Sequence, residues 1–246
     1  MPCRAVIFDY IGTLVNCIDY SMVNSEAKLY AALTAEGFVL EQEKFLRAYR
    51  DAHQRYRRIR YEQFREVTNA VWVSEALCNL GFKTTPKDER VKIALNIFFQ
   101  DFIDTLELRR GAKCLLAQTA EQYRVGLISN FTHAPVVHKS LRRVGIHNYF
   151  NAVVISQEVK CRKPSLRIFC DTLSRLGVQA HEAVFIGDSP LEDIKGAKEA
   201  GLRTVFVSSQ FNSLEDLAQS RQVPDEIVTE LEDIPHKLSR IFPGGT

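Results

Sequence analysis

Six short runs of apolar residues, rich in Val, Ile and Phe, stand out along the chain. They cover residues 4–8, 123–129, 152–156, 183–187, 203–208 and, more weakly, 226–229. We interpret each as a strand buried on both faces, because such strands lose the apolar-polar alternation of half-exposed ones. Helical spacing appears between them, at residues 134–144, 164–176 and 191–200. Strands that alternate with helices in this way predict an α/β protein with a doubly wound parallel sheet.

The stretch from residue 16 to residue 108 breaks this rhythm. It contains no convincing buried strand, and its apolar residues recur at helical spacing in four groups, around residues 27–35, 45–56, 70–80 and 93–98. Gly37, Gly81 and Pro86 supply the breaks between the helices. We therefore predict two domains. Residues 1–15 and 109–246 form the α/β core, and residues 16–108 form an all-helical cap over the carboxyl edge of its sheet.

Composition excludes several classes of protein. Hydrophobic residues make up 46% of the chain and charged residues 25%, which is typical of globular domains rather than disordered or fibrous chains. A formal net charge of +2 gives no reason to expect a nucleic-acid partner or a membrane surface. Residues 47–65 hold seven arginines, which we interpret as a solvated helix face or as a surface that attracts an anionic substrate.

The six cysteines are scattered, with neither a C-x-x-C pair nor zinc-like spacing. We expect them to be small buried hydrophobic residues. The chain has no apolar run of about 18 residues, which a membrane span requires. The first apolar run is interrupted at Asp9, so it is too short for the apolar segment of a secretion signal. A cytoplasmic protein is the expectation, and the sequence predicts no oligomeric state.

Polar residues that could take part in catalysis or binding follow four of the predicted strands. They are Asp9, Ser129, Asn130, Lys163, Asp188 and Asp193. The carboxyl ends of parallel strands meet at one edge of a sheet, where ligands bind at the point of topological reversal. Alone, Asp9 could cap a turn and Lys163 could be a surface lysine. Together they favour the covalent transfer of an oxyanionic group, in which a carboxylate attacks and a second carboxylate helps to hold Mg²⁺. A cation and a hydroxyl would hold the transferring oxygens.

The segments FDYIGTL (8–14), LISN (127–130), KP (163–164) and IGDSPLED (186–193) resemble the four motifs of the haloacid dehalogenase (HAD) superfamily of hydrolases. The resemblance covers nearly the whole chain. It implies a Rossmann-like core with an inserted helical cap, in agreement with the pattern of elements. It also implies that Asp9 is the nucleophile and that Thr13 orients it.

The resemblance further implies that Ser129, Asn130 and Lys163 bind the transferring group. Mg²⁺ would be held by Asp9, the backbone carbonyl of Ile11, Asp188 and Asp193. The substrate would be a small anionic metabolite, and a phosphate ester or anhydride is the expectation.

One position departs from the pattern of the family's phosphatases, which carry a second Asp two residues after the nucleophile. Here that residue is Ile11. The change removes general acid–base help, which is worth about 10²–10⁴ in rate. This argues against an ordinary phosphomonoesterase, but not against a substrate whose leaving group needs no proton.

The departure leaves other functions open. In a metal-independent 2-haloacid dehalogenase, Asp9 would attack carbon and Arg50 of the cap would receive the halide. That branch generally has Ser and Asn where this chain keeps Gly187 and Asp188. A phosphonoacetaldehyde hydrolase would need a cap lysine, and neither Lys28 nor Lys44 has a distinctive context. A third alternative is a catalytically weak binding protein, which only Ile11 supports.

Overall fold

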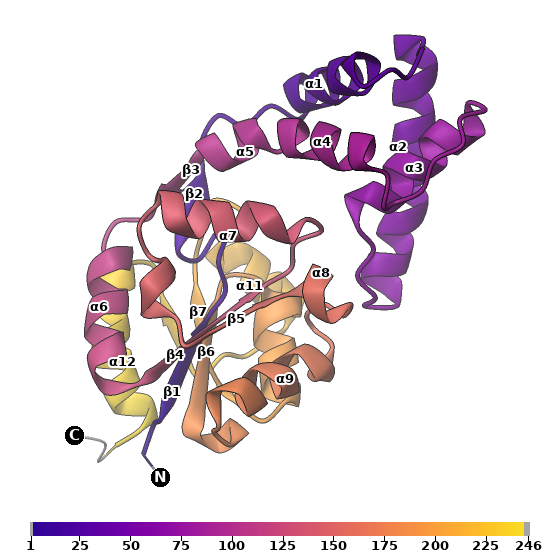
Figure 1. The fold of residues 1–246 in the computed structure, drawn as a ribbon. Helices are drawn as coiled ribbons and strands as arrows, with labels where there is room; N and C mark the ends of the chain where they lie inside the picture. The colour runs from indigo at the N-terminus through magenta and orange to yellow at the C-terminus, as the bar shows by residue number, and fades with distance from the viewer. Residues whose placement is uncertain (1, 244–246) are drawn as a thin grey trace.

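A six-stranded parallel sheet forms the centre of the molecule (Figure 1). The computed structural model describes residues 2–243. The strand order is β5-β4-β1-β6-β7-β8. The bounds are β1 Ala5–Phe8, β4 Arg124–Ser129, β5 Ala152–Ile155, β6 Ala183–Gly187, β7 Arg203–Val207 and β8 Glu226–Val228. All six predicted strands are present, and the predicted α/β fold class is confirmed.

Helices cover both faces of this sheet (Figure 1). Side chains of β1 alternate between them: Val6 and Phe8 pack with α6, α7 and α12, whereas Ala5 and Ile7 pack with α9 and α10. All four side chains are fully buried, which explains why the strand reads as a continuous apolar run. The core helices are α6 Ala112–Gln122, α7 Ala134–Arg143, α8 Ser156–Val159, α9 Leu166–Leu176, α10 Gly196–Glu199, α11 Leu214–Ser220 and α12 Ile234–Ile241.

The register of the central strands determines where the site forms. Phe8 of β1 lies opposite Leu127 of β4 on one side and Ile186 of β6 on the other. The residues that follow these three strands therefore meet at one edge. The chain moves from β1 to β4 in one direction and later returns to β6 on the opposite side, so this edge is a topological switch point.

Five helices form the cap, which stands apart from the sheet over α7 and α8 (Figure 1). They are α1 Met22–Ala35, α2 Gln42–Glu62, α3 Asn69–Asn79, α4 Glu89–Phe98 and α5 Gln100–Asp104. The cap has its own apolar core, in which Phe45, Trp72 and Phe98 are buried. Helical spacing predicted the four longer helices, and the five-residue α5 was missed.

The expectation of an all-helical insertion without strands was wrong at its two ends. Strands β2 Val15–Cys17 and β3 Leu106–Leu108 pair in antiparallel fashion and connect the cap to the core. Three-residue strands are too short to give a hydrophobic period, so only the meeting of the two ends reveals them. The predicted boundaries, between residues 15 and 16 and between 108 and 109, fall within and at the end of this ribbon.

A second connection between cap and core lies beyond α2. Arg65 forms an antiparallel bridge with Cys161, and Glu66 next to it is completely buried. The Glu66 carboxylate accepts hydrogen bonds from Arg60 Nε, at 2.8 Å, and from Ser156 Oγ, and lies 3.6 Å from Arg162 Nη1. We call Arg60, Glu66, Ser156 and Arg162 the cap–core clasp.

Two helix predictions also need correction. Helix α9 begins at Leu166, so Pro164 precedes the helix rather than opening it, and the Lys163–Pro164 peptide is cis. The helix expected over residues 191–200 is a wide π-helical segment, Pro190–Lys195, followed by α10. The segment is shaped by Asp193, whose Oδ2 accepts the backbone N–H of Ser189 at 2.9 Å.

The expectation of buried cysteines was mostly wrong. Cys161 is buried, Cys3 and Cys17 are half-buried, and the other three are exposed: Cys78, Cys114 and Cys170. The exposed ones lie on the solvent faces of α3, α6 and α9. Within residues 2–243, no helix is both long and apolar enough to cross a membrane.

Candidate active site

Asp9 is the first residue after β1 and lies in the middle of the sheet edge. Its backbone N–H donates to Ile186 O at 2.9 Å, which continues the ladder to β6 and fixes the side chain at the switch point. Oδ2 accepts from Thr13 Oγ1 at 3.2 Å, and Oδ1 lies 2.5 Å from Lys163 Nζ. Thr13 and Lys163 therefore each contact one oxygen of the carboxylate.

Lys163 lies beneath the site and is almost fully buried. Its Nζ contacts Asp9 at 2.5 Å and Asp193 Oδ1 at 2.6 Å, and donates to Ile128 O at 3.1 Å. Burial disfavours the charged amine, but the two carboxylates outweigh it and raise the pKa of Lys163 above its ordinary value. The ammonium is therefore a fixed positive charge at the floor of the site.

Asn130 holds Lys163 in place through both ends of its amide. Oδ1 accepts the Lys163 backbone N–H at 2.8 Å, and Nδ2 donates to the Lys163 carbonyl at 3.0 Å. Nδ2 also donates to Glu192 Oε2 at 2.8 Å. Asn130 lines the cavity, but these bonds make it a residue that positions the lysine, in addition to the substrate-binding role implied from sequence.

Asp188 follows β6 and faces Asp9. Its Oδ1 accepts from Thr13 Oγ1 at 3.2 Å, and its Oδ2 accepts from Ser209 Oγ at 2.6 Å and from Asn212 Nδ2 at 3.0 Å. Sequence reasoning missed Ser209 and Asn212. Both lie just past β7, so the signal that identified Asp9 and Asp188, a polar residue after a strand, would have found them.

Three carboxylates gather here with one ammonium. One oxygen each of Asp9, Asp188 and Asp193 lies within 4.8 Å of the others, and all three residues are buried. With Lys163 the group has a formal charge of −2. Burial raises the pKa of Asp9 to about 6, against the lowering effect of Lys163 and helped by the charge of Asp188. Burial also raises the pKa of Asp193 well above its ordinary value.

This donor set fits Mg²⁺, which prefers anionic oxygen ligands and would cancel the excess charge. Two glycines keep the space open for the carboxylates. A Cβ on Gly12 would lie 2.4 Å from Asp188 Oδ2, and a Cβ on Gly187 would lie 2.4 Å from Asp193 Oδ2. The close approach of the backbone to these carboxylates therefore requires glycine at both positions.

A cavity of about 470 Å³ opens over these carboxylates. Ser129, buried at the end of β4, lines it together with Ile11, whose alkyl side chain stands where a second Asp would be expected. Tyr61 of cap helix α2 also lines it, a contribution that sequence reasoning missed. The full lining is Asp9, Ile11, Tyr61, Ser129, Asn130, Asp188, Ser189, Leu191, Glu192, Asp193, Phe211 and Asn212.

Arg50 does not lie in this cavity. It belongs to α2, eleven residues before Tyr61, and its guanidinium donates to Glu26 of α1, at 2.5 Å from Nη2. Its side chain is half exposed and is not among the residues that line the cavity. The structure therefore pairs Arg50 within the cap instead of bringing it to Asp9.

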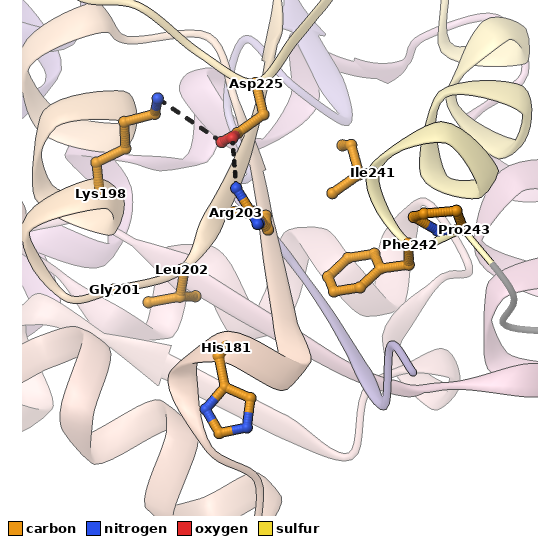
Figure 2. A pocket seen from close by; sticks show the side chains of 9 residues that line it. All are labelled: His181, Lys198, Gly201, Leu202, Arg203, Asp225, Ile241, Phe242 and Pro243. Atoms are coloured by element: carbon orange, nitrogen blue, oxygen red, sulfur yellow. Dashed lines mark hydrogen bonds and ion pairs between the residues drawn. The ribbon is translucent and has the colours of Figure 1, made fainter. Parts of the chain in front are cut away.

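A second cavity, of about 620 Å³, lies at the amino ends of β6, β7 and β8 (Figure 2). Lys198 and Arg203 both point to Asp225, at 3.8 and 3.2 Å (Figure 2). The remaining lining includes His181, Leu202 and Phe242. In this second cavity Lys198 and Arg203 are paired with Asp225, and the cavity lies at the sheet edge opposite Asp9. The cavity of about 470 Å³ over the carboxylates is therefore the better candidate for an active site.

A family model for haloacid dehalogenase-like hydrolases matches residues 3–201. The chain belongs to this family. The chain is 31% identical over 214 residues to a glyceraldehyde 3-phosphate phosphatase from Methanothermobacter thermautotrophicus, which covers 86% of this chain and 88% of that protein. It is 28% identical over 241 residues to a ribulose-1,5-bisphosphate 5-phosphatase from Halopiger xanaduensis, covering 94% and 98%. This HAD hydrolase therefore has relatives with phosphatase names.

Solved structures agree on the fold. A 2-haloacid dehalogenase from Pseudomonas syringae superposes with a TM-score of 0.69 at 23% identity, over 97% of this chain and 99% of that chain. A putative HAD hydrolase from Bacillus subtilis superposes with a TM-score of 0.60 at 20% identity, over 97% and 100%. At these identities the similarity establishes the α/β core with a helical cap, and it does not decide between phosphatase and dehalogenase chemistry.

Proposed function

We propose that this HAD hydrolase is a Mg²⁺-dependent phosphatase of a small phosphorylated metabolite, with Asp9 as the nucleophile. The observation that carries the proposal is the buried group of Asp9, Asp188, Asp193 and Lys163. Its formal charge of −2 suits a divalent cation, and burial of uncompensated charge is expensive. The names of the relatives support a phosphorylated substrate.

In this reaction an oxygen of Asp9 attacks phosphorus, and the bond from phosphorus to the leaving oxygen breaks. A water molecule then hydrolyses the aspartyl-phosphate, which releases phosphate and restores the carboxylate. Thr13, 3.2 Å from Asp9 Oδ2, and Lys163, 2.5 Å from Asp9 Oδ1, hold the attacking carboxylate in one orientation. Lys163 and Ser129 bind the phosphoryl oxygens.

Mg²⁺, when bound by Asp9, Asp188, Asp193 and the carbonyl of Ile11, would neutralise charge on the phosphoryl oxygens. Glu192, Asn130 and Thr13 have a positioning role in this arrangement. Asn130 fixes the backbone of Lys163 at 2.8 and 3.0 Å, and Thr13 bridges Asp9 and Asp188 at 3.2 Å to each.

Ile11 limits the substrates that react quickly. An alkyl side chain neither donates a proton to the leaving oxygen nor accepts one from water. Leaving groups that depart as weakly basic anions, such as phenols and carboxylates, depend least on such help. Aryl and acyl phosphates are therefore the proposed reactive classes. The six free cysteines suit a reducing compartment, and we propose the cytoplasm.

The test is phosphate release from p-nitrophenyl phosphate and acetyl phosphate, with Mg²⁺ and with EDTA. We expect activity only with Mg²⁺, loss of turnover in Asp9→Asn, and weakened Mg²⁺ binding by calorimetry in Asp188→Ala. Asp171→Asn, at a partly exposed ion pair with Arg175 within α9, is the matched control and should behave as wild type. Chloride release from 2-chloropropionate in EDTA would instead establish a metal-independent dehalogenase.

A further inference from the structure

Exposed apolar side chains line the catalytic cavity, in contrast to the buried carboxylates. Tyr61, Leu191 and Phe211 line it and are 47%, 55% and 51% exposed. They come from three separate segments: cap helix α2, the segment after β6 and the loop after β7. Large apolar side chains that gather exposed around a cavity mark a surface that contacts a ligand. Together with Ile11 they are the large apolar side chains of the lining, and we call these four residues the apolar wall.

The lining of the same cavity offers no cationic partner for a second anionic group. Among the described residues that line it, none is Lys or Arg. Two guanidinium groups near these residues are paired with carboxylates: Arg162 donates to Glu192 at 2.9 Å and Arg60 donates to Glu66 at 2.8 Å. A third, that of Arg57, lies over the Tyr61 ring and does not belong to the lining of the cavity. Lys163 is occupied at the floor, where the phosphoryl group would bind. A carboxylate or second phosphate would therefore meet apolar, acidic or neutral polar side chains of the lining, but no cationic one.

Tyr61 is held in place from the core as well as from the cap. The Arg162 guanidinium lies 4.5 Å from the centre of the Tyr61 ring, and that of Arg57 lies 4.8 Å from it. Cations at these distances are attracted to the electron-rich face of an aromatic ring. Since Arg162 directly precedes Lys163, the ring has a defined position relative to the floor of the site.

We propose that this cavity selects phosphate monoesters whose leaving group has an uncharged apolar or aromatic body, with Tyr61 and Phe211 as the specificity-determining residues. The inference rests on the proposed phosphatase function and narrows its substrate class. It excludes substrates with a second anionic group, because no cation of the lining would compensate that group.

The test compares aryl phosphates whose phenols have closely similar acidity, so that only the body of the leaving group differs. We would measure kcat/KM for 3-ethylphenyl, 3-(hydroxymethyl)phenyl and 3-carboxyphenyl phosphate with Mg²⁺. We expect the ethyl compound to exceed the carboxylate by at least roughly tenfold, which is the discrimination that a small apolar contact provides. The hydroxymethyl compound should fall between them.

Variants of Tyr61 and Phe211 test whether these two residues cause the preference for the ethyl compound. Tyr61→Ala and Phe211→Ala should each reduce the ethyl-to-carboxylate ratio severalfold, mainly through KM, whereas Tyr61→Phe should retain it because the ring remains. Ile97→Ala, an equally exposed apolar residue of cap helix α4, is the control and should leave the ratio unchanged.

Equal kcat/KM for the ethyl and carboxylate compounds, or an unchanged ratio in both alanine variants, would overturn this inference and leave the phosphatase function intact. Absence of Mg²⁺-dependent phosphate release from every ester would overturn the proposed function, and the substrate class with it. Thermal unfolding of each variant shows whether a lost ratio reflects lost structure.

Discussion

Gly12 allows the sharpest test of the carboxylate site, because one methyl group there would reach the proposed metal ligand. A Cβ at Gly12 would lie 2.4 Å from Oδ2 and 2.8 Å from Cγ of Asp188. Ordinary contacts between nonbonded heavy atoms lie near about 3.5 Å, so the Asp188 carboxylate must move by about 1 Å. Gly12→Ala should therefore disturb Asp188 without removing any polar atom.

The substitution has a second effect, since Gly12 has a φ of +100°. A side chain in this region costs about 1–3 kcal/mol of folding free energy. Gly81→Ala is the matched control: its φ is +91° and its Cβ would meet no atom within 4 Å. Both variants should lose similar free energy of unfolding in urea, and Gly12→Ala alone should lose function.

For Gly12→Ala we expect Mg²⁺ affinity to fall about 10–100-fold by calorimetry, as it does when support for a metal ligand is disturbed. The kcat/KM for p-nitrophenyl phosphate should fall by up to about 10²-fold, because a displacement of 1 Å has consequences of that size. Wild-type Mg²⁺ affinity in Gly12→Ala would refute the assignment of Asp188 as a ligand. Equal losses in Gly81→Ala would refute the steric reasoning.

Three further predictions follow from single contacts. Ile11→Asp should raise turnover of alkyl phosphates more than that of p-nitrophenyl phosphate, and a rate ratio that is flat across leaving groups would contradict an acid–base deficit. Glu66→Gln should cost about 3 kcal/mol of unfolding free energy, because the buried Arg60 loses its ion pair at 2.8 Å, whereas Glu89→Gln at the exposed pair with Lys92 should cost less than about 1 kcal/mol. Burial, with a smaller contribution from Lys139, lowers the pKa of His133 to about 4, so the unfolded chain binds a proton that the folded chain rejects as pH falls below about 6.5. The free energy of unfolding should therefore fall between pH 6.5 and pH 4 by more in wild type than in His133→Gln, and parallel pH profiles would contradict this.

The parts of the fold that could be predicted are those in which local sequence and tertiary packing agree. Strand β1 is buried on both faces, so its four apolar residues signal a central strand without any knowledge of neighbours. Asp9 and Asp188 could be identified because a polar residue directly follows such a strand. Lys163 does not directly follow a strand: it lies eight residues after the end of β5, and its contacts with Asp9 and Asp193 depend on the fold.

The remaining features depend on segments that meet only in three dimensions. Strands β2 and β3 are more than eighty residues apart, and neither has a recognisable pattern alone. Glu66 looks like one acidic residue among many, yet the fold buries it between cap and core. Arg50 shows the reverse error. Similarity to the dehalogenase branch suggested Arg50 as a halide site. In the fold, α2 packs against α1 and Arg50 donates hydrogen bonds to Glu26 instead.

The clasp connects the cap to Lys163 through a short series of contacts. Glu66 of the cap lies 3.6 Å from Arg162, Arg162 donates to Glu192 at 2.9 Å, and Asn130 donates to Glu192 at 2.8 Å. Asn130 in turn holds the backbone of Lys163 on both sides. The Arg162 guanidinium also lies over the Tyr61 ring. Arg162 therefore contacts Tyr61 directly and is connected to Lys163 through Glu192 and Asn130. A movement of the cap that breaks the contact between Glu66 and Arg162 would therefore displace both Tyr61 and Lys163. If Glu66→Gln reduces activity, we expect a lower kcat as well as a higher KM.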